Sequence, residues 1–206
     1  MTSLVVVSAG LSTPSSTRLL ADGLTSDAVD VLGEGVDVTT IELRHLAHQI
    51  TDHMLTGFTG VELREAIEAV RRADGIIAVT PVFSASFSGL YKNFFDVLEE
   101  GVLDGKPVLV AATAGTARHS LVIDHALRPL FSYLHAVVVP TGVFAATDDF
   151  GDKGLDLRSA RAAGQLAALM GKEPSPMGSL GNRRTVEEEF AQPTPFDTLL
   201  RRASGI

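Results

Sequence analysis

The sequence of 206 residues contains no cysteine and no tryptophan, and only two tyrosines. The lack of cysteine excludes disulfide bonds, thiolate metal sites and thiol nucleophiles. No apolar run approaches the roughly 20 residues that a membrane helix needs, so we expect no membrane span. The chemistry of this chain must come from other groups.

Positive charge is also scarce. Lys and Arg number 17 against 25 Asp and Glu, which gives a net charge of −8. Because binding to nucleic acid needs a basic face and the basic residues here are scattered, we expect no nucleic-acid partner. Met1 leads directly into an apolar stretch without the basic region of a signal peptide, so we expect a cytoplasmic protein.

The pattern of apolar residues predicts one α/β domain over residues 1–170. Short apolar runs alternate with segments of helical periodicity, which is typical of a parallel sheet with helices on both faces. Nearly continuous apolar runs indicate strands whose two faces are both buried. We expect five strands, at residues 4–8, 36–43, 75–80, 107–113 and 136–140.

Helical spacing is clearest in two apolar stripes. Apolar residues recur at intervals of three and four over residues 63–70 and 123–134. We expect two further helices over residues 89–99 and 157–169. The stretch 44–60 gives no clear prediction.

Three histidines in that stretch, His45, His48 and His53, raise the possibility of a metal site. Their spacing is loose and no Asp or Glu motif completes a ligand set. We interpret them as solvated loop residues and predict no metal.

Residues 171–206 differ from the rest of the chain. Residues 172–181 are rich in Pro, Gly and Ser, which is typical of an extended connection without its own core. Phe196, Leu199 and Leu200 are apolar enough to dock on another surface. We predict an extended arm that docks on a neighbouring subunit.

Hydroxyl side chains gather after the first strand, at Ser12, Ser15, Ser16 and Thr17. A helix N-terminus has unpaired amides and a positive dipole end, and hydroxyl groups add donors without bulk. The segment therefore predicts a cradle for a monophosphate. It is neither a Walker A nor a GxGxxG motif. Taken alone, helix capping explains the same residues.

Two more loops of small and polar residues follow the third and fourth strands, at residues 81–89 and 114–119. In a sheet ordered 2-1-3-4-5, the first, third and fourth strands are neighbours. The three loops then meet in one crevice at the topological switch point. A planar ligand that carries one phosphate fits this arrangement.

Two segments resemble the NAD(P)H-dependent FMN reductase family: TPVFSASFSGLYKN at residues 80–93 and IDHALRP at residues 123–129. The chain is most similar to flavin reductases of two-component systems. The resemblance implies a flavodoxin-like three-layer α/β sandwich with strand order 2-1-3-4-5. It also implies hydride transfer from NADPH or NADH to FMN, and a flavin-dependent monooxygenase that receives the reduced flavin.

The resemblance also implies a set of flavin contacts. The phosphate would be held by Ser12, Ser15, Ser16 and Thr17. One edge of the isoalloxazine ring would be bordered by Pro81, Val82, Phe83, Ser84 and Ser86, and the other edge by Thr113, Ala114, Gly115 and Thr116.

The chain departs from the family in two of these loops. Relatives often carry an arginine in the first loop and a tyrosine in the second, where this chain has Ser12 and Phe83. Weak stacking favours a flavin that exchanges rather than one that stays bound. Arg118, just after the third loop, is a candidate contact for the NADPH phosphate. A surface salt bridge is the alternative.

Pro129 falls within the apolar stripe of residues 123–134. It lacks an amide hydrogen and cannot bond the carbonyl of His125, so we expect a kink or a π-bulge. Two-component flavin reductases resemble this chain in carrying a Tyr or His in a π-helix at their subunit interface, and His125 occupies that position. We expect a homodimer or homotetramer, although His125 could also be an ordinary surface residue.

Two other functions fit the same crevice. A quinone or azo reductase that contains FMN would share every feature described so far. An electron carrier of the flavodoxin type would bind FMN without oxidising NADPH or NADH. Such carriers usually stack Trp or Tyr on the flavin, whereas Tyr91 and Tyr133 lie outside the three loops.

Overall fold

The central sheet has the predicted parallel arrangement. In a computed structural model, which describes residues 2–171, the strands follow the order β2-β1-β3-β5-β6, and β7 also pairs with β5. This confirms the predicted order 2-1-3-4-5. The predicted arm, from residue 172 onward, lies outside the described residues. The strands are β1 (Thr2–Ser8), β2 (Val36–Glu42), β3 (Gly75–Phe83), β4 (Ser86–Phe87), β5 (Pro107–Ala114), β6 (Val137–Val138) and β7 (Val143–Ala146).

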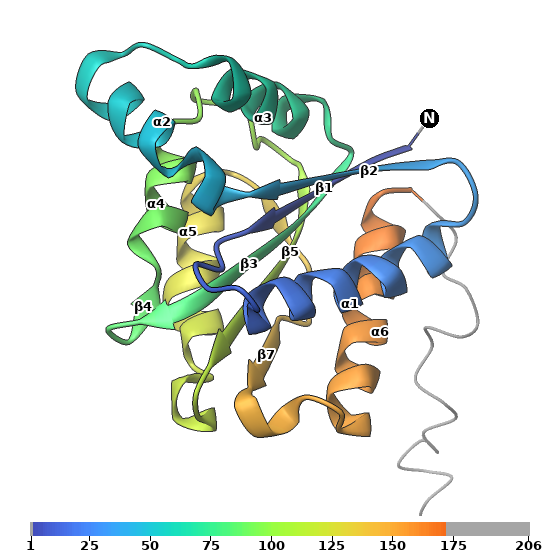
Figure 1. Ribbon diagram of the computed structural model, residues 1–206. Helices are drawn as coiled ribbons and strands as arrows, with labels where there is room; N and C mark the ends of the chain where they lie inside the picture. Colours follow the sequence, from blue (N-terminus) through green and yellow to red (C-terminus); the bar gives the residue numbers. More distant parts are fainter. Residues whose placement is uncertain (1, 172–206) are drawn as a thin grey trace, which may run out of the picture.

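Helices cover both faces of this sheet and give three layers (Figure 1). Two helices, α1 and α6, pack on one face, and the other α-helices pack on the opposite face. In β1, Val5 and Val7 join one core while Leu4 and Val6 join the other, because successive strand residues point to opposite faces. The helices are α1 (Ser16–Leu32), α2 (Leu43–Thr56), α3 (Val61–Arg72), α4 (Gly89–Asp96), α5 (Arg128–Tyr133) and α6 (Lys153–Leu169).

The fifth predicted strand, at residues 136–140, is wrong in its length. Only β6 forms there, and the chain returns to the edge of β5 as β7 after a break. Pro140 has no amide to donate to a ladder. The carbonyl groups of Val139 and Pro140 instead accept hydrogen bonds from the Arg128 guanidinium, at 3.0 and 2.6 Å. A side chain thus replaces the missing strand pairing.

Other boundaries also differ from the prediction. The stretch 44–60 contains α2, which ends at Gly57 in the left-handed conformation. The histidines of this stretch therefore lie on a helix and not in a loop. In addition, α4 ends at Asp96 rather than near residue 99, and α6 begins four residues before the predicted helix. Within residues 2–171, no helix is both long and apolar enough to span a bilayer.

The irregular helix before Pro129 is confirmed. A π-helical turn, η2 (Ile123–Leu127), leads into α5, and the amide of Arg128 donates to the carbonyl of Ile123 five residues earlier. Pro129 cannot continue the regular pattern because it has no amide hydrogen. His125 lies on the exposed side of this turn.

Tyr91 is the largest fully buried side chain of α4, and its hydroxyl group has no hydrogen-bond partner among the described residues. Its ring packs edge-on against Phe95 and Phe131, with centroids 4.8 and 6.4 Å away. This burial raises the pKa of Tyr91 well above its usual range. The hydroxyl group gives up hydration without gaining a bond, which is a cost to folding.

Replacing Tyr91 by phenylalanine should therefore stabilise the protein. Removing an unpaired buried hydroxyl group is worth about 1 kcal/mol, which raises Tm by about 2–4 °C for a chain of this size. Thermal unfolding followed by circular dichroism measures the shift. The control is Tyr133→Phe, because Tyr133 is 83% exposed and its hydroxyl group reaches water. A lower Tm for Tyr91→Phe would show that the hydroxyl group is satisfied.

Candidate functional site

The three predicted loops meet at the carboxyl ends of β1, β3 and β5, which are adjacent strands. The start of α1 lies at this edge, near the β3–β4 hairpin (Figure 1). The first loop spans residues 9–15, the second surrounds the hairpin, and the third runs from Thr113 to Arg118. We call the space between them the crevice.

The first loop bends tightly around Gly10. A Cβ atom at this position would lie 2.1 Å from Ser15 Oγ and 3.2 Å from Thr17 Cβ, so a larger residue would force Ser15 to shift. Ser15 is the N-cap of α1, and its hydroxyl group accepts a hydrogen bond from the Arg18 amide at 3.2 Å. Ser12 and Ser16 are exposed. The loop therefore presents free hydroxyl groups at the N-terminus of a 17-residue helix.

Thr17 and Thr113 connect the first loop to the third. Their hydroxyl oxygens lie 2.8 Å apart, and the two residues are 2% and 3% exposed. One hydroxyl group donates to the other. The structure thus places these two residues beneath the crevice, where they fix the distance between the loops.

The second of the predicted loops forms a hairpin. Strand β3 continues to Phe83 and pairs with β4 in antiparallel fashion, with Phe83 opposite Ser86. The turn residues Ser84 and Ala85 have φ of 48° and 67°, the left-handed values of the tight turns that connect such strands. Thr80 Oγ1 accepts the Ser88 amide at 3.0 Å and closes the base of the hairpin. This bonding gives the second loop a defined shape.

The remaining residues predicted to contact the ring line the same edge. Pro81 and Val82 are half-buried, and Phe83 is 49% exposed. From the third loop, Ala114 is half-buried, while the residues after it are exposed. The exposed members are Gly115, Thr116 and Arg118, the last in a short 3-10 helix, η1 (Ala117–His119).

Two arginines that the sequence reasoning did not assign to the phosphate cradle lie beside the first loop. Arg44, which follows β2, donates from Nη1 to Thr13 Oγ1. Arg18 bonds Glu42 Oε1 and Asp22 Oδ1, each at 2.7 Å. The hydrogen bond to Asp22 raises the pKa of Arg18. The position of Arg44 could have been predicted from the strand order. Because β2 is the parallel neighbour of β1, its carboxyl end lies beside the first loop.

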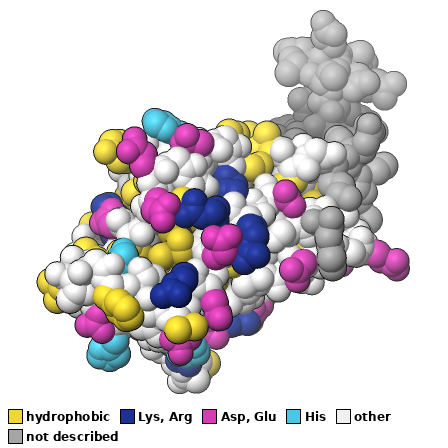
Figure 2. All heavy atoms as spheres, turned by 90° about the horizontal axis from the view of Figure 1, so that it is seen from above, with side chains coloured by type: hydrophobic (Ala, Val, Ile, Leu, Met, Phe, Trp, Pro, Cys, Tyr) yellow, Lys and Arg dark blue, Asp and Glu magenta, His cyan; other side chains and the backbone are white. Residues whose placement is uncertain are grey.

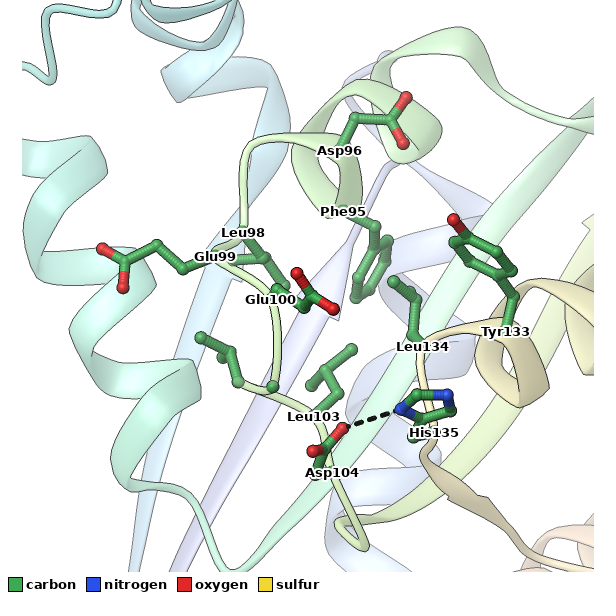
Figure 3. Close-up of a pocket in the computed structure, with 12 residues that line it drawn as sticks. Phe95, Asp96, Leu98, Glu99, Glu100, Leu103, Asp104, Tyr133, Leu134 and His135 are labelled. Carbon is green, nitrogen blue, oxygen red and sulfur yellow. Dashed lines mark hydrogen bonds and ion pairs between the residues drawn. The ribbon is translucent and has the colours of Figure 1, made fainter.

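His125 lies apart from the phosphate cradle, on a groove of about 390 Å³ that starts at the hairpin residues Ser86 and Phe87. Another cavity, of about 550 Å³, lies where α4 ends and β5 begins, away from the crevice. Figure 3 shows that it has an apolar floor and acidic side chains near its rim, with Asp104 bonded to His135 at 3.2 Å.

The crevice has the chemistry of a site for a flat phosphorylated ligand. Hydroxyl groups and the start of α1 supply donors for a phosphate, and small side chains at the two other loops leave room for a ring. Within residues 2–171, no three His, Asp or Glu side chains are grouped as metal ligands. The molecular surface on the side of α2 and α3 carries interspersed acidic and basic side chains (Figure 2).

Comparison with known proteins supports this interpretation. The family model for NADPH-dependent FMN reductases matches residues 2–151. A protein named FMN reductase (NADPH) from Pseudomonas aeruginosa is 36% identical over 167 residues, which are 80% of this chain and 88% of that protein. The NADH-dependent FMN reductase SfnF of Pseudomonas fluorescens is 35% identical over 84% of this chain and 95% of its own length.

Solved structures of oxidoreductases share the fold of this chain. An oxidoreductase from Corynebacterium diphtheriae superposes with a TM-score of 0.81 at 51% identity, covering 84% of this chain and 98% of that chain. The apo form of the NADH:FMN oxidoreductase EmoB gives a TM-score of 0.74 at 26% identity, covering 89% of this chain and 97% of that chain. From its sequence and its fold together, the chain belongs to the NADPH-dependent FMN reductase family.

Proposed function

We propose that this protein transfers a hydride from NADPH or NADH to FMN bound in the crevice, and that the reduced flavin leaves for a flavin-dependent monooxygenase. The observation that carries the proposal is the convergence of the three loops on one edge, with Gly10 and Ser15 shaping the first loop at the start of α1. When bound, the flavin supplies the redox chemistry by accepting two electrons as hydride. The protein supplies position and electrostatics.

The phosphate would be held by the first loop. Ser12 and Ser16 present exposed hydroxyl groups, and the first amides of α1 are free to donate. Arg44, tied to Thr13, brings a guanidinium group to this loop from outside it. We infer that Arg44 supplies part of the positive charge that relatives place at the position of Ser12.

The ring would lie between the hairpin and the third loop. Pro81 to Ser84 and Ser86 border one side, and Ala114 to Thr116 border the other. The buried pair of Thr17 and Thr113 would hold the two sides at a fixed separation. Phe83 and Phe87 are the aromatic residues of these loops, so stacking is modest and release of reduced FMN is favoured.

The π-helix and the groove beside it support assembly into a homodimer or homotetramer. Phe87, Leu130 and Tyr133 line this groove with His125, and Tyr133 is 83% exposed. An exposed apolar surface of this kind is typical of an interface. Sedimentation equilibrium of the full chain tests this, and a monomer at micromolar concentration would contradict it.

An assay with several acceptors tests the proposed reaction. Oxidation of NADPH or NADH is followed with excess free FMN, FAD, riboflavin or a quinone. The proposal expects oxidation that rises with free FMN. Oxidation that depends on quinone and ignores free FMN would assign the protein as a quinone reductase, and FMN binding without any oxidation would assign it as an electron carrier.

Replacing Arg118 by alanine should raise KM for NADPH. Arg118 is exposed beside the third loop, and a charge-assisted hydrogen bond to a phosphate is worth about 1.5–3 kcal/mol before solvent screening reduces it. We expect a severalfold rise in KM with kcat unchanged, measured by initial rates at saturating FMN. Arg64→Ala, on exposed α3, is the control. If KM for NADPH does not change in Arg118→Ala, the residue does not contact the substrate.

A further inference from the structure

A cavity of about 620 Å³ begins where the third loop ends. Ala117, which directly follows Thr116 of the crevice, lines its near wall. The π-helix, the break between β6 and β7, and the start of α6 form the other walls. Its volume lies in the range of ordinary ligand sites.

One wall of this cavity is fixed by Arg128. Its guanidinium group donates to Asp124 at 2.8 Å and to the carbonyl groups of Val139 and Pro140. With three of its five N–H donors bonded to these partners, Arg128 joins the π-helix to the break in the sheet edge. These bonds hold its guanidinium group in place, so that it shapes the wall of the cavity.

Arg158, on the second turn of α6, is in a different position. It is exposed, and its contact with Asp149 Oδ2 is 3.9 Å, longer than a hydrogen bond. That carboxylate oxygen already accepts the Ala146 amide at 2.8 Å. The guanidinium group of Arg158 can therefore turn toward an anion in the cavity without breaking a strong ion pair.

Asp124 and Asp149 also line the cavity, each in contact with an arginine, and the rest of the lining suits a flat base. Half-buried Phe144 offers an aromatic side chain, Ile123 and Pro140 add apolar surface, and Ser120 is an exposed hydroxyl donor. A ligand with a planar base and a phosphate matches an aromatic side chain beside a guanidinium group that is held only by a 3.9 Å contact with Asp149. An adenosine phosphate has this chemistry.

The position of the cavity selects the molecule that carries the adenosine. A hydride donor must place its nicotinamide against the ring in the crevice, and its second half must then extend past one of the loops. We infer that the cavity beyond Ala117 binds the adenosine-phosphate half of the nicotinamide dinucleotide, with Arg158 contacting a phosphate. This inference rests on the proposed function and adds a second binding region and a residue to it.

The test compares Arg158→Gln with Arg161→Gln. Arg161 is exposed on the same helix but does not line the cavity. KM is measured for NADPH, for NADH and for reduced nicotinamide mononucleotide, which lacks the adenosine half. Loss of one charge-assisted contact should raise KM for NADPH about tenfold in Arg158→Gln. Its kcat, and its KM for the mononucleotide, should stay at wild-type values, and Arg161→Gln should behave as wild type.

Three results would overturn the inference. Arg158→Gln could match Arg161→Gln for both dinucleotides, or it could raise KM for the mononucleotide equally. It could also raise KM only for FAD as acceptor, which would assign the cavity to the adenosine half of that flavin.

A binding measurement tests the cavity independently of the proposed reaction. If no nicotinamide is oxidised, calorimetric binding of adenosine 2′,5′-bisphosphate to the full chain still decides the site. Weaker binding by Arg158→Gln than by Arg161→Gln would support the cavity, and equal or absent binding would refute it.

Discussion

Replacing Gly10 by alanine should remove most of the affinity for FMN while leaving a folded protein. The new Cβ atom would lie 2.1 Å from Ser15 Oγ and 3.2 Å from the Cβ atom of buried Thr17. Ser15 could rotate away only by losing its N-cap hydrogen bond, and Thr17 is buried and bonded to Thr113. The first loop must therefore shift at the point where the phosphate would bind.

Overpacking of this kind costs about 1–3 kcal/mol, and a similar loss of binding energy raises the Kd for FMN about 5-fold to 150-fold. Quenching of flavin fluorescence on titration measures this Kd. Gly23→Ala is the matched control, because Gly23 is exposed on α1 with no atom within 4 Å of a new Cβ. That variant should bind FMN normally and be slightly more stable. Normal FMN binding by Gly10→Ala would place the phosphate elsewhere.

The buried pair of Thr17 and Thr113 should show strong energetic coupling. Thr17→Val keeps the shape of the side chain but leaves the Thr113 hydroxyl group buried without a partner, and Thr113→Val does the reverse. Each single change should lower the free energy of unfolding by about 1–3 kcal/mol. The double variant removes both hydroxyl groups, so its loss should be well below the sum of the two single losses.

Urea unfolding of the four proteins in this double-mutant cycle gives the coupling energy. We expect about 1 kcal/mol or more, with FMN affinity reduced in both single variants because the first and third loops are no longer held together. Thr25→Val, at a half-buried hydroxyl group that bonds only a carbonyl of its own helix, serves as a control for the substitution itself. Additive losses would show that the two hydroxyl groups do not depend on each other.

Much of the sheet was predictable because its strands are buried on both faces. Residues 4–8, 75–80 and 107–113 have near-continuous apolar sequences, and all three lie in the observed parallel strands. At the sheet edge of residues 136–146, Pro140 was a local signal for a break, but the return of the chain as β7 was not predicted. The bonds from Arg128 to two carbonyl groups are set by tertiary packing and leave no local pattern.

The features of the crevice were also predictable only in part. The serines of the first loop and the irregular helix at Pro129 were visible because hydroxyl clusters and a missing amide act locally. The hairpin at Ser84 and Ala85 was not, because its turn contains neither Gly nor Asn, the usual residues at positive φ. Arg44 was missed because it lies at the start of α2, which is distant in sequence from the first loop.

The most direct test of the account is anaerobic reduction of free FMN. A catalytic amount of the full chain is mixed with excess FMN and NADPH or NADH, and loss of the oxidised-flavin absorbance is followed over time. We expect many equivalents of FMN to be reduced for each protein molecule, and Gly10→Ala to be much slower at the same FMN concentration. Reduction of no more than one equivalent, or none, would contradict an enzyme that releases reduced flavin.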